Sequence, residues 1–232
     1  EISMNLKKKL NINNSLKFQK QAKEVIPGMT QLLSKRPDMF SYGVWPGYYK
    51  KAKGVYVWDL DNNKYLDMSI SAIGASILGY ADNYVDNKVI QSIKKSVVSS
   101  LNCTEEIKLA KKLISLHPWS DQARFSKSGG EAVAMAVRVA RSYTNKEVIA
   151  FCGYHGWHDW YLAANIKKDN LKEHLLSGLS PNGVPKGLRG TSFPFRYNNI
   201  NDLERIIKQN KNKVAAIIME PLRNFIPKNN FL

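Results

Sequence analysis

The residues best suited to chemistry form a turn of small residues, Ser128-Gly129-Gly130-Glu131, that opens a predicted helix. Because the two glycines lack side chains, backbone N–H groups can approach a ligand closely here. The first N–H groups of a helix have no intrahelical acceptor and lie at the positive end of its dipole. The turn therefore suits a phosphate, to which Ser128 adds a hydroxyl donor. The same residues also fit a capping box, in which Ser128 and Glu131 only terminate the helix.

A second group of chemically useful side chains lies in residues 153–161, which are rich in aromatic rings and include His155 and His158. An aromatic side chain such as Tyr154 can stack on a flat heterocycle, although a packed aromatic loop has the same composition. The two histidines are separated by two residues, and no third ligand nearby completes a metal set. We therefore expect no metal site.

The elements that position these groups alternate between strand and helix. Residues 123–126 and 147–152 are predicted strands, residues 131–143 are the helix between them, and residues 214–219 form a further apolar strand. This order predicts an α/β fold with a mostly parallel sheet and flanking helices.

The carboxyl ends of these predicted strands lie next to the chemically useful residues. The Ser128 turn follows the first strand, the aromatic segment follows Cys152, and Glu220 follows the last strand. Because ligands of parallel sheets lie at this edge, we expect one shared site. The long polar stretch 167–190 is predicted to be a functional loop or part of an interface.

The first part of the chain shows weaker chemical signals. Helices are predicted at residues 15–26, from Asn83 or Asp86 to 99, and at 105–116. Residues 54–68 are predicted to form a hairpin, and the small-residue stretch 69–79 is expected to bring the backbone close to another segment or a ligand. Arg36 lies in the irregular stretch 28–47, where it can meet an anion. A solvated loop arginine is the simpler interpretation of Arg36.

The composition is that of a globular protein, with 44% hydrophobic and 23% charged residues. The net charge of +16 invites a nucleic-acid interpretation, but the lysines are spread along the whole chain and no binding motif accompanies them. No apolar run is long enough for a membrane span. The two cysteines, Cys103 and Cys152, are far apart, which favours a reduced, cytoplasmic setting. We expect neither nucleic acid nor membrane as a partner.

Five stretches of the sequence resemble the class III aminotransferases, which are pyridoxal 5′-phosphate (PLP) enzymes of fold type I. The similarity points to the glutamate-1-semialdehyde 2,1-aminomutase-like branch. The stretches occur in the family's order and span nearly all of the chain. They are residues 54–61 with 65–67, 77–80, 124–132 with 138–141, 153–159 and 218–221.

This resemblance implies that Ser128, Gly129 and Gly130 hold the phosphate of PLP. Gly130 stands where the family has a threonine, so one side-chain donor is lost while the backbone donors remain. Phosphate binding is therefore expected to rest on the backbone N–H groups and on the Ser128 hydroxyl.

The resemblance also implies that Tyr154 stacks on the pyridine ring beside His155, and that Glu220 lies at the edge of the cofactor. Arg36 lies roughly where the aminomutase branch has an arginine for the substrate carboxylate. Residues 222–225 depart from the family's pattern after its Glu-Pro motif, so no role is expected there.

Two further residues carry the family's chemistry, an aspartate that pairs with the pyridinium nitrogen and a lysine that forms the Schiff base. In the family both follow the Glu-Pro motif, whereas this sequence stops at Leu232. No lysine of this sequence has the matching context. We therefore expect no catalytic residue in this chain, which would be an incomplete N-terminal portion of an enzyme and inactive alone.

The expected organisation is an N-terminal segment of helix, loop and β-hairpin in residues 1–68, followed by an incomplete fold-type-I large domain in residues 69–232. The expected function is PLP-dependent transfer of an amino group, of the transaminase or 2,1-aminomutase type. An amino donor, a carbonyl acceptor and a second copy of the chain in a homodimer are the expected partners. The alternatives are a non-catalytic truncated homologue that acts only as a dimer partner and a basic nucleic-acid-binding module.

Overall fold

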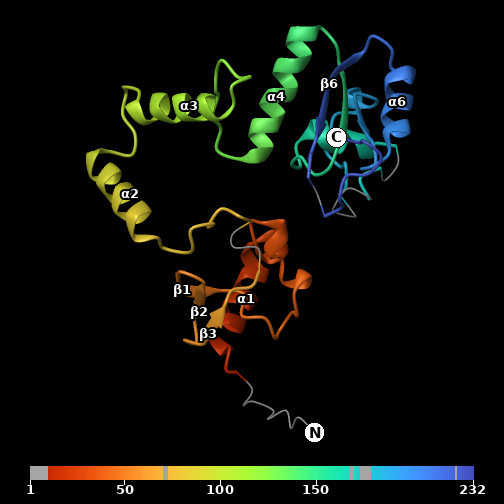
Figure 1. Ribbon diagram of the computed structural model, residues 1–232. Coiled ribbons are helices and arrows are strands. Elements are labelled where there is room, and N and C mark those ends of the chain that lie inside the picture. The colour runs from red at the N-terminus through yellow and green to blue at the C-terminus, as the bar shows by residue number, and fades with distance from the viewer. Residues whose placement is uncertain (1–9, 70–72, 168–169, 173–178, 223) are drawn as a thin grey trace. The chain divides into compact units, whose positions relative to one another are not determined.

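The computed structural model describes residues 10–69, 73–167, 170–172, 179–222 and 224–232. The chain divides into two compact units, Glu1–Asn102 and Cys103–Leu232 (Figure 1). The predicted domain boundary after residue 68 stays a prediction. The small-residue stretch 69–79 and the polar loop 167–190 lie partly outside the described residues.

The first unit contains the two helices that local signals predicted there. Helix α1 (Asn13–Val25) confirms the helix expected at 15–26, and 3-10 turns follow it. These turns are η1 (Pro27–Met29), η2 (Leu33–Lys35) and η3 (Pro37–Met39). Helix α2 (Asn83–Lys95) is capped by Asp82, whose Oδ1 accepts the N–H groups of Tyr84 and Val85 at 3.0 Å. The cap is thus one residue earlier than the candidates in the sequence, and the helix ends before residue 99.

A three-stranded antiparallel sheet completes the first unit. Strands β2 (Tyr56–Asp59) and β3 (Lys64–Leu66) confirm the predicted hairpin, and β1 (Tyr49–Lys53) adds a third strand beside β2. The turn is held by the buried carboxylate of Asp59, which accepts the N–H of Asn63 at 2.8 Å and the hydroxyl of Tyr65 at 2.8 Å. Burial and the neighbouring Asp59 raise the pKa of Tyr65 to about 12.

The second unit holds a three-stranded parallel sheet in the order β5-β4-β6. Its strands are β4 (Val148–Cys152), β5 (Ser192–Pro194) and β6 (Val214–Met219). Its helices and turns are α3 (Thr104–Leu116), α4 (Gly129–Thr144), α5 (Asp159–Leu162), η4 (Ala163–Asn165), η5 (Lys186–Leu188) and α6 (Ile200–Gln209). The predicted parallel α/β arrangement is thereby confirmed.

Strand β4 is the centre of the core, and all five of its residues are buried. Ile149 and Phe151 belong to one apolar cluster with α4, whereas Ala150 and Cys152 belong to a second cluster with α6. This alternation follows from the two-residue period of a strand. Figure 1 shows α4 and α6 on opposite sides of β6, as the two clusters require. A strand apolar on both faces is typical of a parallel sheet covered by helices.

Two strand assignments differ from the sequence-based expectation. Residues 123–126, predicted as a strand, form none, because no other described segment pairs with their backbone. Strand β5 was not predicted, since it is three residues long and ends in Pro194, which has no N–H for a ladder. Both differences concern pairing, which depends on distant segments rather than on local composition.

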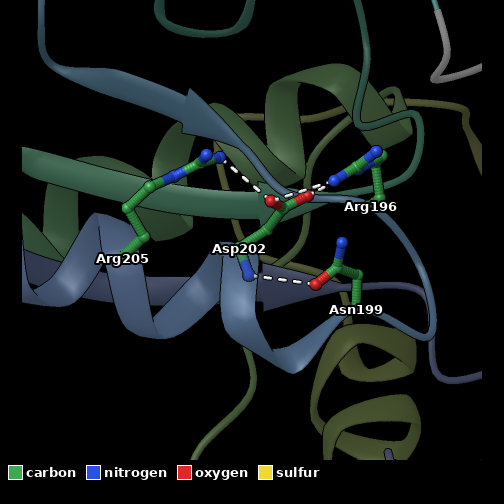
Figure 2. Close-up of polar contacts among 4 residues, drawn as sticks. All are labelled: Arg196, Asn199, Asp202 and Arg205. Atoms are coloured by element: carbon green, nitrogen blue, oxygen red, sulfur yellow. Dashed lines mark hydrogen bonds and ion pairs between the residues drawn. The ribbon is translucent and has the colours of Figure 1, made fainter.

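An ion-pair cluster fixes the start of α6 after β5 (Figure 2). Asp202 is 7% exposed, and its carboxylate accepts from Arg196 Nε at 2.7 Å and from Arg205 Nη2 at 2.9 Å. The Asn199 side chain caps the helix by accepting the Asp202 N–H at 3.1 Å. The hydrogen bonds from Arg196, with smaller contributions from both arginine charges, hold the pKa of Asp202 below its usual value.

Candidate functional site

The Ser128 turn forms the capping box that its sequence allowed. The Ser128 hydroxyl oxygen accepts the N–H of Glu131 at 3.3 Å. In return, Glu131 Oε2 accepts the N–H groups of Ser128 at 3.1 Å and of Lys127 at 2.9 Å. The interpretation of this motif as a capping box is therefore correct. The capping box holds the turn in one conformation at the start of α4.

The capping box leaves donors of this turn available to a ligand. The Ser128 oxygen is the acceptor in its bond with Glu131, so its O–H proton remains free to be donated. The N–H groups of Gly129 and Gly130 have no backbone acceptor within the described part of the chain. Three donors thus lie together at the positive end of a 16-residue helix, a combination that suits a phosphate.

The loop after β4 approaches this turn at the level of the backbone. A Cβ built on Gly156 would lie 2.8 Å from the Cα of Gly130, and Gly156 has a φ of +95°. A Cβ built on Gly130 would lie 2.7 Å from Cε1 of His158. Gly156 therefore requires glycine, because a side chain there would meet the backbone of the turn, whereas a side chain at Gly130 would require the His158 ring to move.

Tyr154 lies in the same loop and is held in place by Tyr161. The two rings meet edge to face, with centroids 5.8 Å apart and an interplanar angle of 81°. Tyr161 is buried, and its hydroxyl donates to the carbonyl oxygen of Gly153 at 3.0 Å. Tyr154 itself is half-buried, and this burial raises the pKa of its phenol.

His155 is directed into the core of the second unit. Its Nε2 lies 2.9 Å from the carbonyl oxygen of Cys152, so this nitrogen carries the proton and donates it. The ring also meets Phe151 edge to face, with centroids 6.2 Å apart. His155 thus fixes the loop that carries Tyr154.

Glu220 follows β6 and lies over the residue that follows β4. Its backbone N–H donates to the Cys152 carbonyl at 3.1 Å, which continues the parallel ladder by one residue. A Cβ built on Gly153 would lie 2.5 Å from Glu220 Oε2, and Gly153 has a φ of +107°. The Glu220 carboxylate is thereby placed at the carboxyl edge of the sheet.

The structure brings the site residues predicted in the second unit to the carboxyl edge of the sheet and the start of α4. This group consists of Ser128, Gly129, Gly130, Tyr154, His155 and Glu220. Arg36 lies in the first unit, with its Nε 3.5 Å from Asp38 Oδ1. A role for Arg36 at this site stays a prediction.

Sequence reasoning missed three residues that shape this edge. In the sequence, Tyr161 is only a member of an aromatic segment, His158 is considered only as a metal ligand and rejected, and Gly153 has no assigned role. The signal in the sequence is the pair Gly153 and Gly156, which flanks Tyr154 and His155. Two glycines that close together around an aromatic residue indicate a backbone that must approach another segment.

Neither a metal centre nor a membrane-crossing helix occurs in the part of the chain that the structure describes. No three His, Cys, Asp or Glu residues in it are arranged to hold a metal ion. Its helices also lack the combination of length and hydropathy that crossing a bilayer requires.

Comparison with protein families gives the class of this chain. Residues 41–224 match the model of the class III aminotransferases. This match covers most of the sequence, and the chain therefore belongs to the class III aminotransferase family. Enzymes of this family are PLP-dependent.

Two curated relatives are aminotransferase or aminomutase enzymes, and the alignment with each covers only about half of the relative's length. A 3-aminobutyryl-CoA aminotransferase from Cloacimonas acidaminovorans is 35% identical over 215 residues, which are 92% of this chain and 48% of the relative. A glutamate-1-semialdehyde 2,1-aminomutase from Wigglesworthia glossinidia brevipalpis is 36% identical over 231 residues, which cover 95% of this chain and 52% of the relative. The chain thus spans about half the length of the curated relatives it matches.

Solved structures confirm the fold. An omega-transaminase from Sphaerobacter thermophilus superposes with a TM-score of 0.74 at 27% identity. The superposition covers 89% of this chain and 47% of the transaminase. The predicted PLP-dependent transferase fold of type I, present in part, is therefore correct.

Proposed function

We propose that this chain carries the phosphate-binding turn and the ring-binding loop of a PLP-dependent enzyme that transfers an amino group. The enzyme would be of the transaminase or 2,1-aminomutase type, which are the activities named for its relatives. One observation carries the proposal: the capped turn at Ser128 and the loop around Tyr154 meet backbone to backbone at Gly130 and Gly156. That contact supports a single site that contains both phosphate donors and an aromatic ring.

The phosphate of PLP would be held by the first turn of α4. The N–H groups of Gly129 and Gly130 and the hydroxyl of Ser128 are the donors, and the helix dipole favours the negative charge. Glu131 keeps these donors aligned through its bonds to the N–H groups of Ser128 and Lys127. Its carboxylate points back at the backbone before the helix.

The ring of PLP would lie against Tyr154, whose own position is fixed by Tyr161. His155 would support this loop from the core, and Glu220 would border the ring from the end of β6. When bound, PLP supplies an electron-withdrawing ring on which an amino group can be exchanged. The residues of this chain would bind and orient that ring.

We assign the proton-moving lysine and the aspartate partner of the ring nitrogen to no residue of this chain. In the family these residues follow the Glu-Pro motif, which is Glu220-Pro221 here. The 232 residues by themselves are therefore expected to bind the cofactor reversibly and to transfer no amino group. The substrates would be an amine and a carbonyl compound, and a second copy of the chain would be the partner.

The proposal is tested by titrating the full-length protein with 4′-deoxypyridoxine 5′-phosphate, a PLP analogue that lacks the aldehyde and so does not react with surface lysines. We expect saturable binding, and a loss of about ten-fold in affinity for Ser128→Ala, since a hydrogen bond to a charged group is removed. The matched control is Ser115→Ala in α3, whose hydroxyl donates only to the Lys112 carbonyl. Absence of binding by the full-length protein would refute the proposed function.

A further inference from the structure

The imidazole of His158 lies directly against the phosphate-binding turn. A Cβ built on Gly130 would lie 2.7 Å from its Cε1 and 2.8 Å from its Nδ1. A Cβ built on the neighbouring Gly129 would meet nothing within 4 Å. His158 therefore covers one side of the turn, and it does so only at the second glycine.

The Nδ1 atom of His158 is buried, and it has no hydrogen-bond partner among the described residues. Buried polar atoms of proteins are nearly always paired, because an unpaired one has lost its water without compensation. The packing around Gly130 and Gly156 does not explain this atom, since carbon would fill the same space.

The unpaired nitrogen lies next to a donor of the turn. A Cβ built on Gly156 would lie 3.7 Å from His158 Nδ1 and 3.8 Å from the backbone nitrogen of Gly130. That position itself is closed, because it lies 2.8 Å from the Cα of Gly130, so the two nitrogens border the same contact between loop and turn. A tetrahedral anion at the start of α4 has several oxygens and can accept from more than one neighbouring donor.

We propose that His158 is a further ligand of the cofactor phosphate, donating a hydrogen bond from Nδ1 beside the N–H groups of Gly129 and Gly130. This inference rests on the proposed function, and it adds a side-chain donor from the loop after β4 to a phosphate site otherwise built from one turn. The loop that carries Tyr154 would then contact both the ring and the phosphate. Binding of the phosphate would hold loop and turn together.

The test uses the full-length protein and two ligands, 4′-deoxypyridoxine 5′-phosphate and 4′-deoxypyridoxine, which differ only in the phosphate. His158→Ala should lower the affinity for the phosphorylated ligand about ten-fold, the usual effect of losing a hydrogen bond to a charged group. Affinity for the ligand without phosphate should not change. His158→Asn, whose amide nitrogen takes the place of Nδ1, should retain most of the affinity.

A second readout is the phosphorus-31 resonance of the bound phosphorylated ligand. It should move in His158→Ala and stay near the wild-type position in His158→Asn. Equal losses for both ligands, or no loss in His158→Ala, would overturn the inference and leave His158 as packing. If the wild-type protein fails to bind the phosphorylated ligand, the proposed function falls and this inference falls with it.

Discussion

At the scale of single residues, the carboxylate of Glu220 reaches the sheet edge because residue 153 is glycine. A Cβ at this position would lie 2.5 Å from Glu220 Oε2, and the φ of +107° is one that residues with side chains rarely adopt. The Tyr161 hydroxyl holds the carbonyl of the same glycine at 3.0 Å. Gly153 therefore sets both the direction of the chain after β4 and the place of the carboxylate.

We predict that Gly153→Ala destabilises the chain by about 1–3 kcal/mol, because it combines backbone strain with a clash. The control is Gly187→Ala, since a Cβ there would meet nothing within 4 Å and its φ is an ordinary one. Urea denaturation of both variants measures the difference. Equal midpoints for the two variants would contradict the strain assigned to a side chain at Gly153.

Asp202 allows a prediction about pH. Its folded pKa is lowered, chiefly by hydrogen bonds from Arg196. Its stabilising contribution is therefore complete above the unfolded pKa of about 3.9 and is lost as pH falls through the folded pKa. Asp202→Asn should lower the free energy of unfolding by about 1–3 kcal/mol at pH 7, and this deficit should shrink below about pH 4.

Denaturation of wild type and Asp202→Asn across this pH range provides the measurement. Asp38→Asn is the matched control, because the Asp38 side chain is 66% exposed and its contact with Arg36 is 3.5 Å long. Such surface pairs contribute little at any pH. A deficit for Asp202→Asn that is the same at pH 3 and pH 7 would contradict the role assigned to its charge.

At the scale of elements, α4 owes its precise start to the capping box. Ser128 and Glu131 each satisfy a backbone N–H of the other, and Glu131 also accepts from Lys127. The N–H groups of Gly129 and Gly130 are left at the front of the helix by this arrangement. The capping box therefore both stabilises the helix and leaves the N–H groups of Gly129 and Gly130 available to a phosphate.

We predict that Glu131→Ala costs about 0.5–2 kcal/mol of stability and weakens binding of 4′-deoxypyridoxine 5′-phosphate, because the turn loses its alignment. Glu131→Gln should be close to wild type, since the amide oxygen can still accept from the backbone. Thermal unfolding and ligand titration of the two variants give the comparison. Wild-type ligand affinity in Glu131→Ala would show that ligand binding does not depend on the capping box.

Helices could be predicted well from the sequence, and strands less well. Helix α1 ends before Pro27, and the predicted range of α3 differs from the observed one by a single residue, although neither helix has a side-chain cap at its start. Strand β5 and the failed strand at residues 123–126 depend on which backbone lies beside them. A local pattern carries no information about that neighbour.

At the scale of the whole molecule, each unit has one helix whose apolar side chains are uncovered within that unit. Neither α2 nor α3 has a buried residue. Val89, Ile90 and Ile93 are exposed on α2, and Ile107 and Leu109 on α3. Exposed apolar side chains in this number are typical of interaction surfaces. They support the proposed homodimer.

We predict that the full-length protein is a dimer at micromolar concentration and that Ile90→Asp shifts it toward monomer, because a buried unpaired charge opposes association. Gln91→Glu, on the polar side of α2, is the control and should remain dimeric. Sedimentation velocity distinguishes the two states. A monomeric wild type, or a dimer unaffected by Ile90→Asp, would exclude α2 from the interface.

The sequence by itself determined the family, the parallel α/β class and the candidate cofactor-binding residues Ser128, Gly129, Gly130, Tyr154, His155 and Glu220. Those signals are local, since turn chemistry, apolar runs and short motifs are written in neighbouring residues.

Only the tertiary structure decided which side chains meet. It placed His155 against the Cys152 carbonyl, His158 against Gly130, and the Glu220 carboxylate over Gly153. The contacts of His158 and Glu220 join residues that are distant in the sequence, and the geometry of all three contacts depends on the packing of the sheet and its helices.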